Sequence, residues 1–76
     1  MDSRQRSLIR QHTVAARQYK WAVEELRRRV ENGEDVAGFR EWIVTPAREH
    51  CYRLFHTWLT EYKPELVRKA QFRAGL

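Results

Sequence analysis

Residues 8–30, LIRQHTVAARQYKWAVEELRRRV, carry the pattern that decides the fold of this chain. Largely apolar side chains recur there every seven residues in two rows, and the rows form a seam of Ile9, His12, Ala16, Tyr19, Val23, Leu26 and Val30. Leu8, Ala15 and Ala22 widen the seam to roughly 140° of the circumference of a helix, which is typical of one buried face. The pattern predicts one long amphipathic helix over residues 4–31.

Glycine and proline mark the ends of the helices that the rest of the chain predicts. Gly33 follows the seam and predicts a helix C-cap, and Asp35 predicts the N-cap of the next helix. Thr45 and Pro46 together are typical of a helix start, and Pro64 disfavours helical geometry at the residue before it. No segment alternates with the two-residue period of a strand. We therefore expect an all-α fold with helices over residues 4–31, 36–44, 46–62 and 65–73.

Two further apolar faces complement the seam. The segment 36–44 has a small face of Val36, Phe39, Trp42 and Ile43. The segment 46–62 has a broader stripe of Ala47, Cys51, Tyr52, Leu54, Phe55, Trp58, Leu59 and Tyr62. These faces predict a three-helix bundle that forms a single small domain over residues 1–76. A seven-residue seam of this length also permits pairing between two copies of the helix, so a homodimer is the alternative to an intramolecular core.

The composition excludes several classes of protein. A chain of 76 residues buries only a small core and leaves little room for a deep substrate pocket. Its one cysteine, Cys51, forms no intramolecular disulfide and no multi-cysteine zinc site. No run approaches the ~18 apolar residues of a membrane span, and Leu8-Ile9 is the only apolar pair near the N-terminus. We therefore expect a soluble, cytoplasmic protein with no signal peptide and no membrane partner.

No arrangement of reactive side chains predicts catalysis or metal binding. His12 lies in the seam, where a structural role is the usual one, and His50 and His56 fall roughly 120° apart on their helix. Spacings typical of metal sites, such as His-x-x-x-His and Cys-x-x-Cys, do not occur in the sequence. Cys51 lies on the apolar stripe with no predicted base beside it, which indicates a buried, unreactive thiol. We expect no enzymatic activity, no metal and no cofactor.

The net charge of +5 is distributed unevenly along the chain. Residues 1–30 and 50–76 are basic, whereas residues 31–49 are acidic. In three places an acid precedes an arginine by four residues, the favourable order for an ion pair on a helix: Glu24–Arg28, Glu25–Arg29 and Glu49–Arg53. These pairs would neutralise much of the run of arginines at 27–29.

A second group of basic residues has no such local explanation. Arg6, Arg10 and Arg17 lie within about 40° of one another on the helix, opposite the seam. Cations near a helix N-terminus are unfavourable, so helix formation does not account for Arg6. Val14 and Trp21 lie at the edge of this stripe, away from the predicted core. We call these five residues the Arg/Trp surface and predict that it binds another macromolecule, because tryptophan and arginine are enriched among interface hot spots.

The favoured partner of the Arg/Trp surface is another protein, for which the chain would act as a regulatory adaptor, inhibitor or assembly subunit. The alternative is a nucleic acid, since guanidinium groups contact phosphates and an indole stacks on an unpaired base. A helix-turn-helix that reads DNA with residues 46–62 is a weaker hypothesis. It would place the carboxylate of Glu49 at a position that normally packs inward.

Overall fold

The computed structural model describes the backbone of residues 2–73 and the side chains of residues 2–69. Along the chain lie α1 (Ser3–Glu31), α2 (Ala37–Phe39), η1 (Arg40–Val44), α3 (Thr45–Tyr62) and α4 (Pro64–Arg73). No strand occurs within residues 2–73. The predicted all-α fold is confirmed, and so is each of the four predicted helical segments.

Both ends of the 29-residue helix α1 are capped. At its start, Oδ1 of Asp2 accepts a hydrogen bond from the backbone N–H of Gln5 at 2.6 Å. At its end, Gly33 adopts a positive φ of 75°, and its N–H donates to the carbonyl of Val30 while the N–H of Glu34 donates to that of Arg29, each at 3.0 Å. These two bonds form a Schellman motif, so the predicted glycine C-cap is confirmed.

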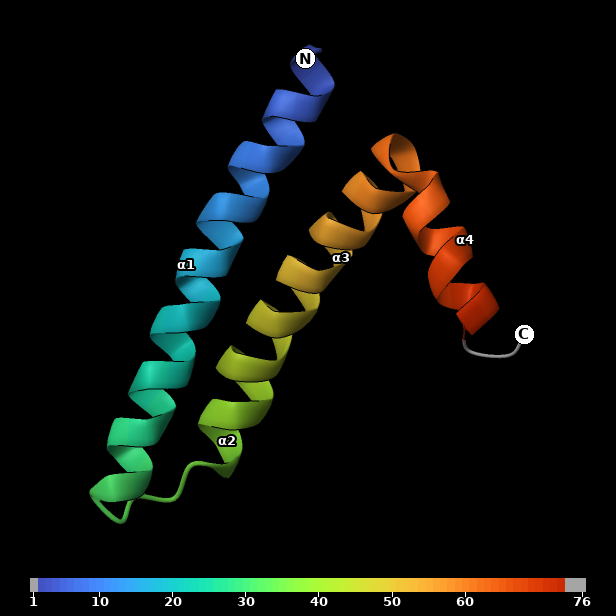
Figure 1. The fold of residues 1–76 in the computed structure, drawn as a ribbon. Helices are drawn as coiled ribbons and strands as arrows, with labels where there is room; N and C mark the ends of the chain where they lie inside the picture. The colour runs from blue at the N-terminus through green and yellow to red at the C-terminus, as the bar shows by residue number, and fades with distance from the viewer. Residues whose placement is uncertain (1, 74–76) are drawn as a thin grey trace.

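The segments α2, η1 and α3 join into one helix from Ala37 to Tyr62 (Figure 1). The N-cap residue is Val36, one residue later than the predicted Asp35, although Oδ1 of Asp35 accepts a hydrogen bond from the N–H of Ala37 at 3.1 Å. The predicted N-cap at Thr45 is wrong, because Thr45 is itself helical and its N–H donates to the carbonyl of Arg40, five residues back. This π-helical bond displaces the hydrogen-bond ladder by one residue. The helix therefore continues through Pro46, which lies in the first turn of α3 and has no N–H to donate.

The π-helical segment also changes which side chains are buried. Its extra residue rotates the preceding positions relative to α3, so that Val44 becomes buried with 8% of its surface exposed. Trp42 is 71% exposed and Ile43 is exposed as well. The predicted inward orientation of Trp42 and Ile43 is therefore wrong, whereas Val36 and Phe39 are half-buried.

Helix α1 and the joined helix run antiparallel and side by side (Figure 1). The buried residues among those described are Leu8, Ala15, Ala22 and Val44. The row of α1 that faces the joined helix is thus the row of Leu8, Ala15 and Ala22, at the edge of the predicted seam. The small alanine side chains in this row allow the two helices to approach closely. Of the seam itself, Ile9 and Val30 are exposed. The remaining members are half-buried: His12, Ala16, Tyr19, Val23 and Leu26.

Helix α4 begins at Pro64 and diverges from the end of α3, on the side of α3 that is remote from α1 (Figure 1). The helices therefore lie in one flat layer that measures 45 × 35 × 16 Å, with α3 in the middle. The radius of gyration is 16.0 Å, whereas a compact chain of this length has about 11 Å. The apolar stripe of α3 is accordingly only half covered, and Tyr52 and Phe55 are exposed.

Candidate functional site

The Arg/Trp surface lies along the exposed side of α1, and at one edge Arg10 and Val14 line an open hollow together with His50 of α3. Arg6, Arg10 and Arg17 are between about 140° and 180° around the helix from the buried row of Leu8, Ala15 and Ala22. All three are exposed, and none of the ion pairs within residues 2–69 involves them. Val14 is also exposed, and Trp21 is 57% exposed. The structure therefore brings the five predicted residues together on one open face.

Trp21 is held in place by a cluster that the sequence does not reveal. The edge of its indole meets the ring of Phe39, with the ring centroids 6.3 Å apart and an interplanar angle of 68°. The guanidinium of Arg29 lies 4.2 Å from the centroid of the same Phe39 ring. Phe39 is eighteen residues from Trp21, so only the antiparallel pairing of the helices brings the two together. The result is a solvent-facing indole with one edge against Phe39.

Glu25 fixes the position of Arg29 and of one further arginine. Its Oε1 accepts from Nε of Arg29 at 3.0 Å, and its carboxylate also accepts two bonds from Arg28. These hydrogen bonds lower the pKa of Glu25 from 4.5 to about 2. The predicted Glu25–Arg29 pair is confirmed. The predicted Glu24–Arg28 pair is wrong, because Arg28 turns to Glu25, and the predicted Glu49–Arg53 pair is not among the ion pairs of residues 2–69.

This carboxylate predicts a loss of stability in acid. A group whose pKa is lower in the folded than in the unfolded chain stabilises the fold above its unfolded pKa, and that contribution disappears as the pH falls. For Glu25 the loss runs from about pH 4.5 to about pH 2. We expect the free energy of unfolding, measured by urea titration, to fall over this range. The fall should be shallower in Glu25→Gln and unchanged in the neighbouring Glu24→Gln. Equal falls in wild type and Glu25→Gln would contradict this account.

A second polar cluster joins the start of α1 to the end of α3. Arg4 donates from Nε and Nη2 to the two carboxylate oxygens of Glu61, each at 2.7 Å, and this lowers the pKa of Glu61. The hydroxyl of Tyr62 donates to Oδ1 of Asp2 at 3.2 Å. Burial and the Asp2 carboxylate raise the pKa of Tyr62. Arg4 thus contributes to the fold, whereas Arg6, two residues later, takes part in none of the ion pairs within residues 2–69.

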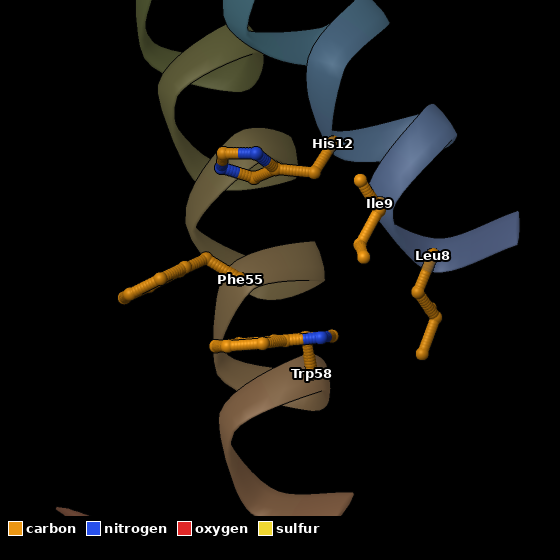
Figure 2. Close-up of a pocket in the computed structure, with 5 residues that line it drawn as sticks. All are labelled: Leu8, Ile9, His12, Phe55 and Trp58. Carbon is orange, nitrogen blue, oxygen red and sulfur yellow. The ribbon is translucent and has the colours of Figure 1, made fainter. Parts of the chain in front are cut away.

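On another side of the hairpin lies a groove between α1 and α3. Figure 2 shows one part of it, a cavity of about 190 Å³ between Leu8, Ile9 and His12 of α1 and Phe55 and Trp58 of α3. A second hollow of about 200 Å³ shares His12 and Phe55 with the first and extends the groove along the helices. We call the combined lining the apolar groove, which consists of Leu8, Ile9, His12, Tyr19, Arg48, Cys51, Tyr52, Phe55 and Trp58.

Aromatic rings form the floor and the rim of the apolar groove. The ring centroids of Phe55 and Trp58 are 6.3 Å apart at an angle of 22°, and those of His12 and Phe55 are 5.8 Å apart (Figure 2). Nε1 of Trp58 is buried without a hydrogen-bond partner among the described residues. Ile9 and Phe55 are 40% and 43% exposed at the rim. The groove is therefore an open apolar surface and differs from an enclosed ligand pocket.

The groove also contains a thiol–imidazole contact, with Sγ of Cys51 3.5 Å from Nε2 of His12. The expectation that no base lies beside Cys51 is therefore wrong, since the pairing of helices joins residues 39 positions apart. A nucleophilic site requires in addition a group that orients the imidazole and donors for an oxyanion. In the part of the chain with described side chains, no three His, Cys, Asp or Glu residues are grouped to hold a metal ion. His50 and His56 are exposed on α3.

Comparisons with models of protein families, with curated proteins and with solved structures found no match to this chain. Among residues 2–73, no helix combines the length and the apolar content that crossing a membrane requires. Evidence on function therefore comes from the two surfaces, the Arg/Trp surface and the apolar groove.

Proposed function

We propose that this chain is a small, non-enzymatic binding protein that docks onto an acidic and partly apolar surface of another protein. It would act there as an adaptor, an inhibitor or an assembly subunit. The observation that carries the proposal is Trp21, whose indole is 57% exposed although Phe39 holds its edge. An indole that already contacts Phe39 loses less conformational freedom on binding than one without such a contact, and this favours affinity.

The arginines of the Arg/Trp surface support the same function. Arg10 and Arg17 have no ion-pair partner within residues 2–69, and they flank Val14 and Trp21 on the same side of the helix. Arginine and aromatic residues are both enriched at protein interfaces, and here they lie side by side. The arginine charges would attract an acidic partner and raise the rate of association at low salt.

Replacement of Trp21 tests the proposal. Trp21→Ala should weaken binding of the partner about 10- to 100-fold, the range for loss of a hot-spot tryptophan, with no loss of helix content by circular dichroism. Trp42→Ala is the matched control, because Trp42 is 71% exposed but lies outside the Arg/Trp surface. The measurement is affinity capture from the native host with nuclease present, followed by titration of the captured protein. Equal retention by Trp21→Ala and wild type would contradict the proposal.

The alternative function is nucleic-acid binding by the same stripe, which the three exposed arginines favour. If nuclease abolishes capture of the partner, that result would favour nucleic-acid binding over protein binding. If Arg6, Arg10 and Arg17 each contact a phosphate, log K should then fall with log of the salt concentration at a slope of about −2 to −3. A slope near zero would exclude this version.

A further inference from the structure

We propose that the apolar groove is a self-association surface, occupied by the groove of a second copy of this chain in a twofold dimer. Two flat hairpins would then face each other and build the second layer of helices that a single layer lacks. Helical domains bury their apolar faces by packing at least two layers together. The proposal concerns a different face from the Arg/Trp surface and does not depend on the function proposed there.

The accessible surface of the chain has the size that such a dimer requires. The chain exposes 6277 Å², whereas a compact monomer of 9.2 kDa exposes about 4,900 Å². The excess is about 1,300 Å² for each copy, or about 2,600 Å² for a pair. Interfaces of obligate homodimers bury about 2,000 to 5,000 Å² in total. The flat single layer, taken as a whole, therefore leaves enough surplus surface for a dimer interface of ordinary size.

The shape of the groove suits a copy of itself. Hollows of about 190 and 200 Å³ lie beside projecting side chains, Ile9 and Phe55, within the same surface. In a twofold dimer the same patch of each copy meets its counterpart on the other copy, so the patch must contain both projecting side chains and hollows that receive them. Both hollows are open to solvent, whereas a typical small-molecule pocket encloses most of its ligand. Side chains of a second copy are thus better occupants than a small ligand.

The seam of α1 provides a second argument for a second copy. Seven-residue repeats are typical of helices that pair with other helices, and Ile9, Ala16 and Tyr19 belong to this repeat. The fold uses the neighbouring row, Leu8, Ala15 and Ala22, to contact α3. The seam is therefore left only partly covered, on the side of α1 that borders the groove.

The charges of the chain do not oppose this pairing. Arg48 is the one charged residue among the nine that line the groove. On α1, Arg10 lies about 160° around the helix from His12, and Trp21 lies about 160° from Tyr19. The Arg/Trp surfaces of the two copies would thus face outward, on opposite sides of the dimer. Their repulsion would be screened at physiological salt, where the Debye length is about 8 Å.

The test is the mass of the chain in solution, measured by sedimentation equilibrium from 1 to 200 µM. We expect wild type to reach twice 9.2 kDa. Ile9→Glu and Phe55→Glu should each raise the dimer dissociation constant about 100-fold or more, because each would bury an unpaired carboxylate. Val14→Glu is the matched control on the Arg/Trp surface and should dimerise like wild type. Monomeric wild type over this range, or a mass that rises beyond the dimer, would overturn the proposal.

A second measurement decides the case in which the groove variants fail to fold. Alkylation of Cys51 in the wild-type chain should slow as the protein concentration rises and follow the dimer fraction, because Cys51 lines the groove. The melting temperature should rise with concentration in parallel. Alkylation at a rate independent of concentration would place the dimer contact elsewhere and overturn the proposal. If Val14→Glu were monomeric while Ile9→Glu remained dimeric, the dimer contact would lie on the Arg/Trp surface and the proposal would be overturned.

Discussion

Replacing Ala22 by leucine should lower the free energy of unfolding by about 1–3 kcal/mol, the usual cost of overpacking a close contact. Ala22 is 1% exposed and, with Ala15, belongs to the buried row along which α1 approaches the joined helix of Ala37–Tyr62. A leucine there has to push the helices apart or adopt a strained rotamer. A chain of 76 residues has about 4 to 11 kcal/mol of stability, so the loss is a large fraction of the total. Urea titration followed by circular dichroism measures it.

The matched control is Ala16→Leu, because it introduces the same side chain in a different row. Ala16 belongs to the seam and is half-buried, outside the buried row, so a leucine there extends toward solvent. We expect its free energy of unfolding to change by less than about 0.5 kcal/mol. Equal destabilisation by the two substitutions would mean that the seam itself faces α3 and would contradict the observed packing.

The helices were predictable from sequence because the signals that delimit them are local. Gly33 ends α1 through its own positive φ and the Schellman bonds around it, and Asp35 accepts a hydrogen bond from Ala37 in the first turn of the next helix. Pro64 disfavours helical geometry at Lys63, which lies between α3 and α4. Each of these features depends on a few residues that are adjacent in the sequence, so it can be predicted from the sequence alone.

The packing was not predictable to the same extent, because it depends on contacts between distant segments. Periodicity located the apolar side of α1 but did not distinguish the row of Ala15 from the row of Ala16, which differ by only one residue. The π-helical bond from Thr45 to Arg40 rotates Trp42 toward solvent. No feature of the sequence predicted this bond. The contact of Cys51 with His12 and that of Trp21 with Phe39 arise from the same antiparallel pairing.

The two candidate surfaces follow from one property of the fold. Because small residues bring α1 close to α3, the larger apolar side chains remain at the sides of this contact, where a single layer of helices does not cover them. On one side they form the apolar groove, around Ile9 and Phe55. On the other side Trp21 stands beside unpaired arginines, among the residues that the structure describes. A dimer through the groove would therefore present two Arg/Trp surfaces to partners.

Replacing Gly33 by alanine should destabilise the fold by about 1–2 kcal/mol, the cost of a left-handed conformation for a residue with a Cβ atom. Its φ is +75°, and no atom lies within 4 Å of the position a Cβ would take. The whole effect therefore comes from the backbone and not from a steric clash. Urea titration at a fixed protein concentration measures the change.

Gly38 provides the opposite result with the same substitution. It lies within helix α2, and a Cβ built there also meets no atom within 4 Å. Gly38→Ala should therefore stabilise the chain by about 0.5–1 kcal/mol, because alanine loses less conformational entropy than glycine in a helix. Stabilisation by both substitutions would mean that α1 does not end in the Schellman motif. The hairpin would then lack the turn that holds α1 against α3, and both candidate surfaces depend on that pairing.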